Sequence, residues 1–160
     1  MGHCTPITEC LACGNVDLVP TLDLGEQPLA NNFRSTTATE PRYPLAINRC
    51  RHCNHLQLTH AVDPTLIFKN YLYVSGTSRT MMEYFEWFAD FVVEYLPYSY
   101  PNGKVLEIGC NDGYMLKNFS SIEHLGIDAS AGPVSVARSK NLNVETGFFG
   151  NKSYGSFDLI

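Results

Sequence analysis

The chain has 160 residues, a net charge of −5 and a hydrophobic content of 44%. These values are typical of a soluble globular protein with one domain or two small ones. Lysine and arginine are scattered along the chain, which argues against a nucleic-acid-binding face. No apolar run approaches the roughly 20 residues that span a bilayer, and the N-terminus lacks the pattern of a signal peptide. We therefore expect a cytoplasmic protein with neither nucleic-acid nor membrane partners.

Four of the six cysteines form two matching Cys-x-x-Cys pairs, Cys10 with Cys13 and Cys50 with Cys53. In a reducing compartment such pairs favour a metal over disulfides. Two such turns can complete a tetrahedron of sulfur around one ion, which predicts a structural zinc site with no open position for a substrate. Iron in a rubredoxin-like site suits the same ligands. Two unrelated pairs of buried cysteines are the alternative without a metal.

The residues around the cysteine pairs support the metal interpretation. Gly14 and Asn54 follow the two pairs, and both types tolerate the left-handed backbone that can turn N–H groups toward thiolates. Arg49 and Arg51 flank the second pair and can offset its negative charge. The 36 residues between the pairs exceed the usual zinc-ribbon spacing, so we expect them to fold back as a loop or hairpin. Residues 1–60 are thus predicted to form a four-cysteine zinc-binding module of short strands and loops.

Residues 61–97 are predicted to be a helical connector. Within it, residues 78–96 repeat large apolar side chains every three or four positions, with acidic residues on another stripe. Ser78 can cap the start of this helix and Pro97 ends it, which favours a helix that packs on a core and exposes an acidic face. Just before it, residues 71–78 hold two tyrosines and several hydroxyl groups. They can present hydroxyls to a polar ligand, or form only a turn and a cap.

Residues 98–160 alternate strand-like and helix-like segments, which predicts a parallel α/β sheet. The residues at 98–103 are the expected joint ahead of this sheet. We expect four strands, at residues 104–108, 125–128, 144–149 and 157–160, with helices after Gly113 and at residues 130–140.

The turn after the first of these strands carries the most specific chemistry. Glu107, Gly109 and Gly113 frame it, and glycines at a strand-to-helix turn let a ligand approach the backbone closely. Asn111 stands where the dinucleotide motif has its second glycine, and Asp112 beside it would repel a pyrophosphate. An acidic turn instead suits a cofactor with a sulfonium and an amino-acid head. The turn therefore favours S-adenosylmethionine over a nicotinamide dinucleotide.

Asp128 ends the second predicted strand, about 20 residues beyond the turn, where a carboxylate can accept hydrogen bonds from both ribose hydroxyls. Together with this acid, the E-x-G-x-x-x-G turn resembles motif I of class I methyltransferases. The order of motifs along the whole chain resembles the bacterial sugar C-methyltransferases with an N-terminal zinc-binding domain, typified by the C-3 methyltransferases of nucleotide-linked 4-keto sugars. These motifs lie at residues 24–31, 43–45, 57–58, 71–75 and 107–113.

The resemblance implies S-adenosylmethionine as methyl donor and a dTDP-linked keto-deoxysugar as acceptor. A base would remove the proton beside the ketone, and the enolate carbon would then attack the methyl group. The resemblance further implies that Tyr73 faces the sugar and that Asp128 holds the ribose of the cofactor. The residues that it places around the rest of the cofactor are Glu107, Gly109, Asn111 and Gly113.

In the same family the histidine base lies beyond residue 160, so the resemblance assigns that role to no residue of this chain. We therefore expect the chain to hold only the N-terminal half of the cofactor-binding sheet and to be inactive by itself. The competing interpretation from another class is a zinc-ribbon-like binding module on an α/β scaffold without methyl transfer. A nicotinamide-dependent enzyme is a third, which the acidic turn disfavours.

Overall fold

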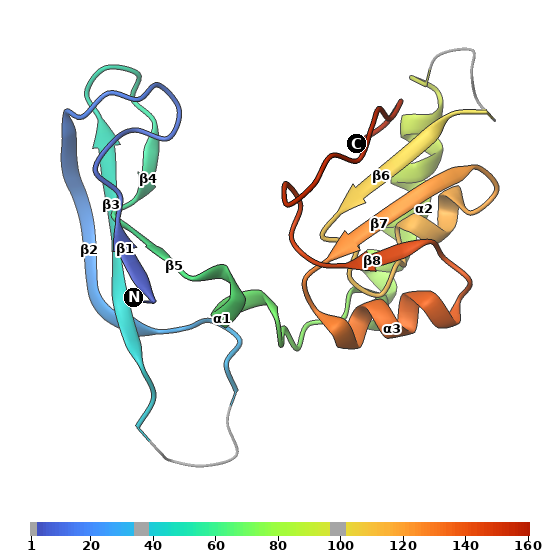
Figure 1. The fold of residues 1–160 in the computed structure, drawn as a ribbon, viewed down its shortest axis with the longest axis horizontal. Coiled ribbons are helices and arrows are strands. Elements are labelled where there is room, and N and C mark those ends of the chain that lie inside the picture. Colours follow the sequence, from blue (N-terminus) through green and yellow to red (C-terminus); the bar gives the residue numbers. More distant parts are fainter. Residues whose placement is uncertain (1–2, 34–38, 97–101) are drawn as a thin grey trace. The chain divides into compact units, whose positions relative to one another are not determined.

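The structure, a computed structural model, describes residues 3–33, 39–96 and 102–160 (Figure 1). The chain forms two compact units, Met1–Ile67 and Phe68–Ile160. The predicted helix end at Pro97 lies outside the described residues, as does most of the predicted joint at residues 98–103. In the part of the chain that is described, no helix is both long enough and apolar enough to cross a bilayer.

The first unit is built on an antiparallel hairpin of β2 (Leu18–Pro28) and β3 (Arg42–Cys50). β4 (Leu56–Leu58) pairs with the other edge of β3, and β1 (Cys4–Pro6) pairs separately with β5 (His60–Val62). The hairpin confirms the predicted fold-back between the cysteine pairs.

The two hairpin strands are longer than the short strands that the sequence predicted. The register shifts between Pro20 and Leu22 and again between Asp23 and Glu26. Each shift is a bulge that moves the following side chains to the opposite face. The alternation of apolar and polar residues is therefore broken into short pieces, although the strand continues.

Few side chains are buried in the first unit. Among its described residues, only Cys10, Cys50 and Gln57 are buried. A unit of this size gains little stability from so small a core. A metal that links the two cysteine pairs would therefore supply much of the free energy of folding.

The second unit contains a parallel sheet in the order β6 (Lys104–Ile108), β7 (Glu123–Asp128) and β8 (Val144–Thr146). Ile108 lies opposite Ile127, so the carboxyl ends of β6 and β7 meet at one edge of the sheet. On the other side of β6, Val105 forms a parallel bridge with Leu159. Helices connect the parallel strands, so the predicted α/β class is confirmed.

Two helices of the second unit pack on this sheet. α2 (Arg79–Val93) begins after Ser78, whose Oγ accepts a hydrogen bond from the Met81 N–H at 3.4 Å. α3 (Ala131–Ser139) follows β7. Two clusters of buried side chains form the core. The first joins α2 to β6 and consists of Ala89, Val105, Phe119 and Ile122. The second joins α3 to β8 and consists of Cys110, Leu116, Val134, Ala137, Leu142 and Val144. The shorter helices are α1 (Pro64–Phe68), η1 (Ser75–Thr77) and η2 (Leu116–Phe119).

Three predicted elements differ from the observed ones. The third strand ends at Thr146 rather than residue 149, and the fourth is only the bridge at Leu159. The helix predicted after Gly113 is the single 3-10 turn η2. Only residues 114–122 separate Gly113 from β7, and Phe119 and Ile122 must also reach the core. The connection is therefore short, and Phe119 and Ile122 attach it to the core.

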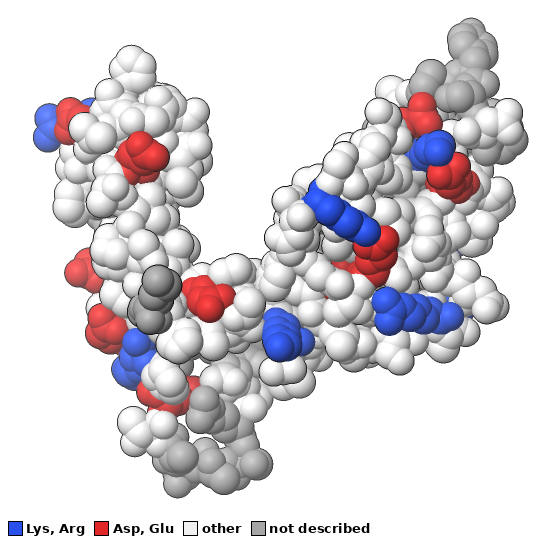
Figure 2. All heavy atoms as spheres, viewed as in Figure 1, with Lys and Arg blue, Asp and Glu red and all other residues white. Residues whose placement is uncertain are grey.

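Charged residues are interspersed on the face drawn in Figure 2, where lysine and arginine lie beside aspartate and glutamate. Several form surface ion pairs, such as Lys104 with Glu123 at 2.8 Å. No basic patch of the kind that binds nucleic acid is visible on this face.

Candidate functional site

The hairpin brings the four predicted metal ligands together in the first unit. The sulfur atoms of Cys10, Cys13, Cys50 and Cys53 all lie within 4.8 Å of one another. The Cys10–Cys53 distance is 3.6 Å and the Cys13–Cys50 distance is 3.7 Å. A tetrahedron with zinc–sulfur bonds of about 2.3 Å has sulfur–sulfur edges of about 3.8 Å. The cluster therefore has the donor set and the size of a four-thiolate zinc site.

The backbone around the cluster explains how thiolates can persist there. Burial raises the pKa of Cys10. The backbone N–H groups of Ala12 and Cys13 and the neighbouring thiols lower it by more than burial raises it, and the pKa is about 7. The N–H of Asn15 lowers the pKa of Cys13, whereas burial and three nearby thiols raise it to about 12. The cluster without metal thus shares protons among its sulfurs, and metal binding must displace them.

Gly14 and Asn54 adopt the predicted left-handed conformation, with φ angles of 72° and 62°. Their own N–H groups do not point at sulfur, however. They donate to the carbonyls of Cys10 and Cys50 at 2.8 and 3.0 Å and so close the two turns. The N–H groups that bond to the thiol groups are instead those of Ala12, Cys13 and Asn15.

Gln57 on β4 holds the turn that carries Cys10 and Cys13, a role that its neighbours in the chain do not indicate. Its Oε1 accepts from the Leu11 N–H at 2.9 Å, and its Nε2 donates to the Glu9 carbonyl at 2.9 Å. Both partners lie more than 40 positions away, so no local pattern could reveal them. Because the Gln57 side chain is 94% buried, losing these bonds would leave polar groups without water.

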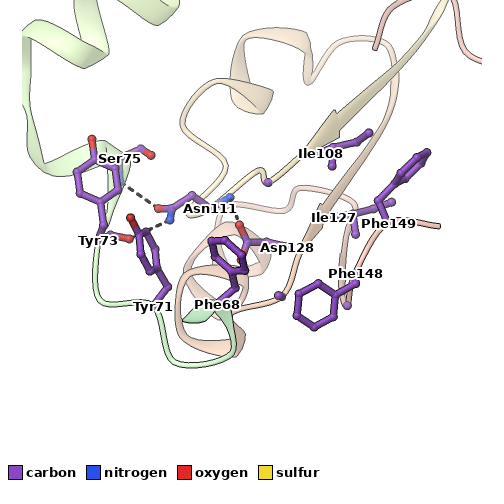
Figure 3. A pocket seen from close by; sticks show the side chains of 13 residues that line it. Phe68, Tyr71, Tyr73, Ser75, Ile108, Asn111, Ile127, Asp128, Phe148 and Phe149 are labelled. Atoms are coloured by element: carbon purple, nitrogen blue, oxygen red, sulfur yellow. Dashed lines mark hydrogen bonds between the residues drawn. The ribbon is translucent and has the colours of Figure 1, made fainter. Parts of the chain in front are cut away.

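The second unit has a pocket of about 470 Å³ at the carboxyl edge of β6 and β7 (Figure 3). Ligands of parallel α/β sheets bind at this edge. Four of the predicted ligand-binding residues line the pocket, namely Tyr73, Gly109, Asn111 and Asp128. The other lining residues are Phe68, Tyr71, Ser75, Ile108, Ile127, Ala129, Gly147, Phe148 and Phe149.

Gly109 and Asn111 line this pocket and belong to the loop from Gly109 to Gly113, called the glycine loop below. Gly109 has a φ of +77° and no atom within 4 Å of the position that a Cβ would take. Its backbone therefore faces open space, as close approach of a ligand requires. Asp128 accepts from the Ser130 N–H at 2.7 Å through Oδ1 and from the Asn111 N–H at 2.9 Å through Oδ2. These bonds fix the carboxylate at the edge of the sheet and leave each oxygen a second lone pair.

Glu107 does not line the pocket but lies behind the glycine loop. Burial raises the pKa of its carboxyl to about 8, opposed by the Leu116 N–H and reinforced by the charges of Asp112 and Asp128. Its Oε2 is buried and has no hydrogen-bond partner among the described residues. Such an oxygen beside two further carboxylates makes this region suited to a cationic group.

Gly113 also lies away from the pocket, and its role is packing. A Cβ there would lie 2.5 Å from Leu142 Cδ1 and 3.0 Å from Ala137 Cβ, and φ is +71°. The glycine is thus required for α3 to pack against the loop rather than for contact with a ligand. Asp112 is 3% exposed and pairs with Lys140, whose Nζ lies 3.2 Å from Oδ2.

Asn111 is 8% exposed, and its side chain faces residues 71–77, called the strap below. Its Oδ1 accepts from the Ser75 N–H at 3.0 Å, and its Nδ2 donates to the Tyr73 carbonyl at 2.9 Å (Figure 3). The strap therefore presents Tyr71 and Tyr73 to the pocket, with ring centroids 6.4 Å apart. The sequence allowed two interpretations of this segment: it presents polar side chains to a ligand, or it forms only a turn and a cap. The position of the two tyrosines at the pocket supports the first.

The sequence did not reveal the aromatic walls of the pocket. Phe68 lies 6.1 Å from Tyr71 between ring centroids, and Phe148 and Phe149 follow the end of β8. Periodicity alone predicts core packing for these residues. Phe148 and Phe149 could have been identified by their position just after a parallel strand, at the edge where ligands bind, whereas Phe68 in α1 has no such signal.

Comparison with known proteins finds similar sequences for both units. Residues 10–68 match the family model Methyltransf_13, described as "Putative zinc binding domain". With the four-sulfur cluster, this match identifies the first unit as a zinc-binding unit. Over 144 residues, 86% of the chain, the sequence is 30% identical to C-methyltransferase NovU of Streptomyces niveus. The chain spans 31% of the length of that relative.

Two solved structures are also similar to part of the chain. One is the plantazolicin methyltransferase BpumL in complex with SAH, with 24% identity, a TM-score of 0.42, and coverage of 48% of this chain and 33% of that chain. The other is a SAM-dependent methyltransferase from Archaeoglobus fulgidus, with 28% identity, a TM-score of 0.30, and coverage of 39% and 29%.

Proposed function

We propose that the protein is an S-adenosylmethionine-dependent C-methyltransferase whose acceptor is a dTDP-linked keto-deoxysugar. The likeness to C-methyltransferase NovU over most of the chain supports the methyl transfer. The motif order that resembles the sugar C-methyltransferases supports the acceptor. The pocket at the carboxyl edge of β6 and β7 supplies a place for both ligands.

The electrostatics around the glycine loop carry the choice of cofactor. Asp112 and Asp128 lie close to the glycine loop, and among the described residues only Lys140 forms an ion pair with either of them. The Glu107 carboxyl, with a pKa of about 8, is mostly protonated near neutral pH and adds little to this charge. A pyrophosphate would meet this negative charge at close range, whereas an ammonium or sulfonium would offset it. The orphaned Oε2 of Glu107 supports the same choice.

In this proposal each pocket residue has a separate task. The open backbone at Gly109 lets the methionine portion lie against the loop, and the spare lone pairs of Asp128 accept the ribose hydroxyls. When bound, S-adenosylmethionine supplies the electrophilic methyl group. Tyr73, which is 47% exposed, faces the acceptor from the strap. The zinc is structural, because four thiolates close its coordination.

Calorimetry with S-adenosylhomocysteine and with NAD tests the cofactor. We expect only the first to bind, and Asp128→Ala to weaken binding by at least about tenfold, since hydrogen bonds to a charged group contribute about 1.5–3 kcal/mol. Asp90→Ala is the matched control, because it removes the same charge from an exposed position of α2 in the same unit. Binding of NAD, or equal affinities of the two variants, would reject the assignment.

The acceptor is tested on protein saturated with S-adenosylhomocysteine. We expect binding of a dTDP-linked 4-keto sugar and weaker binding of the dTDP-linked sugar that carries a hydroxyl in place of the ketone. Equal binding of both would contradict the keto-sugar assignment. A protein that binds neither S-adenosylhomocysteine nor the nucleotide sugar would instead support the alternative, a zinc-binding module on an α/β scaffold.

A further inference from the structure

The strap is attached to the glycine loop through its backbone rather than through its side chains. Three strap groups bond to two adjacent loop residues. The Ser75 N–H and the Tyr73 carbonyl bond to the Asn111 amide, and the Gly76 N–H donates to Asp112 Oδ1 at 3.3 Å. Such an attachment fixes the path of the strap and leaves the tyrosine side chains available to the pocket.

The fit between strap and loop is close at Gly76. A Cβ at this position would collide with the Asp112 carboxylate and lie 3.1 Å from Tyr114 Cδ2. Asp112 cannot easily yield, because Lys140 binds both its carboxylate and its carbonyl, the latter at 2.9 Å. The loop therefore determines where the strap lies.

Asn111 occupies a special place in this contact. Its φ of 51° is in the left-handed region, which turns its side chain toward the strap while its N–H donates to Asp128. Asn111 thus contacts Asp128, the proposed acceptor for the ribose hydroxyls, through its backbone. Through its side chain it contacts the strap, which contains Tyr73. Asn111 therefore links Asp128 directly to the strap at Tyr73 and Ser75. A second route reaches the strap at Tyr71, because the Ser130 N–H donates to Asp128 and the Ser130 Oγ donates to the Tyr71 carbonyl at 3.4 Å.

We propose that Asn111 is a positioning residue that couples occupancy of the glycine loop to the placement of Tyr73 in the pocket. This inference rests on the proposed function, in which the loop binds the cofactor and Tyr73 faces the acceptor. It reassigns Asn111 from direct contact with the cofactor to orientation of the acceptor side. The amide of Asn111 suits this role because it has one acceptor and one donor. The acceptor bonds to the Ser75 N–H and the donor to the Tyr73 carbonyl, so the strap is held in one position.

Three variants separate this role from mere stability. Asn111→Gly removes both side-chain bonds but keeps the backbone N–H and tolerates the positive φ. Asn111→Asp keeps the acceptor for the Ser75 N–H but loses the donor to the Tyr73 carbonyl. Gly76→Ala displaces the strap from its own side without altering Asn111. Asn118→Ala is the matched control, because its Nδ2 donates to the Phe85 carbonyl at 3.3 Å, outside the pocket.

The first measurement is amide hydrogen exchange, resolved by NMR, in the protein without ligand. We expect exchange at Ser75 to rise about fivefold to tenfold in Asn111→Gly, the change for one lost hydrogen bond. Gly76→Ala should also speed exchange at Ser75. In Asn111→Asp the Ser75 amide should stay protected, and in Asn118→Ala it should be unchanged.

The second measurement is the ¹⁹F resonance of fluorotyrosine at position 73, assigned by its loss in Tyr73→Phe, during titration with S-adenosylhomocysteine. The unchanged protein and Asn118→Ala should show a ligand-dependent shift. Asn111→Gly and Asn111→Asp should still bind S-adenosylhomocysteine but lose that shift. Unaltered exchange at Ser75 in Asn111→Gly, or an undiminished shift in that variant, would overturn the proposal. Failure of the unchanged protein to bind S-adenosylhomocysteine would instead overturn the proposed function.

Discussion

Glu107 makes the stability of the second unit depend on pH. Its folded-state pKa is about 8 against an ordinary value of 4.5, because burial penalises the charged form. Below pH 4.5 the carboxyl is protonated in both states and this contribution is fully present. As pH rises toward 8, the unfolded state loses its proton first, so the free energy of unfolding falls. Above the folded pKa the loss is complete.

Glu107→Gln should therefore raise the free energy of unfolding at pH 8, on the order of 3 kcal/mol, and remove most of the decline between pH 5 and pH 8. Denaturant unfolding of the second unit at several pH values measures both effects. Glu123→Gln is the control, because its carboxylate is exposed and, among the described residues, pairs with Lys104 alone. A parallel decline in Glu107→Gln and the unchanged protein would mean that Glu107 is not the titrating group.

The two loop glycines should respond differently to substitution. Gly113→Ala places a methyl against Leu142 and Ala137 in addition to the strained φ, so it should destabilise the unit by about 2–4 kcal/mol. Gly109→Ala carries similar backbone strain, with a φ of +77°, but its methyl meets no atom within 4 Å. It should therefore lower stability less than Gly113→Ala does, and it should weaken binding of S-adenosylhomocysteine. Calorimetry and thermal unfolding of both variants provide the comparison. Equal losses of stability would refute the distinction.

Residue positions that depend on neighbours in the chain were predictable from the sequence. The two cysteine pairs and the acid at the end of β7 could be predicted from spacing alone. The partners of Asn111 could not, because Tyr73 and Ser75 lie 38 and 36 positions away and bond through backbone atoms. A side chain that recognises backbone leaves no trace in the residue type of its partner.

The start of α2 is defined by one side chain. Ser78 Oγ accepts from the Met81 N–H, and the strap ends immediately before it. Ser78→Ala should lower the free energy of unfolding by about 1 kcal/mol. Ser139→Ala is a suitable control, because Ser139 lies in the last turn of α3 and its Oγ donates to the Val136 carbonyl of the same helix. A loss no larger than that of the control would show that Ser78 does not stabilise the helix.

Helices in which apolar side chains recur every three or four residues were predictable from the sequence. Elements whose length depends on how the chain connects to the next strand were not. The predicted helix at residues 78–96 appears as Arg79–Val93, and the helix at 130–140 as Ala131–Ser139. By contrast, η2 replaces a predicted helix because the path back to β7 is short. β8 stops at Thr146, and the Gly147 N–H donates to the Asp128 carbonyl at 2.8 Å. That bond depends on the neighbouring strand, which the local sequence does not encode.

For the whole molecule, the two units should differ in their dependence on metal. We expect one zinc per chain, and removal of it by a strong chelator should unfold the first unit, because its described part buries only three side chains. The core of β6–β8 and its helices contains no cluster cysteine and should persist. Elemental analysis, with NMR spectra before and after chelation, measures both.

Single substitutions refine this test. Cys53→Ser should abolish stoichiometric zinc binding and unfold the first unit, as the chelator does. Cys4→Ser should retain the metal, because Cys4 lies outside the cluster. Lowering the pH should release zinc, since protons compete for the four thiolates. Full retention of zinc in Cys53→Ser, or an intact first unit after chelation, would contradict the assignment.

The irregular course of β2 has a consequence for how copies of this chain behave in a crowded solution. β2 is the outer strand of its sheet, and an outer strand normally offers a row of free backbone groups to a second molecule. In β2, Pro20 has no backbone N–H to donate, and two bulges interrupt the row of backbone groups. Gly25, with a φ of +67°, also changes the direction of the strand. Intermolecular strand addition is thereby disfavoured even though Leu22 and Leu24 are about half exposed. The hairpin that assembles the metal cluster is thus protected against aggregation along its open edge.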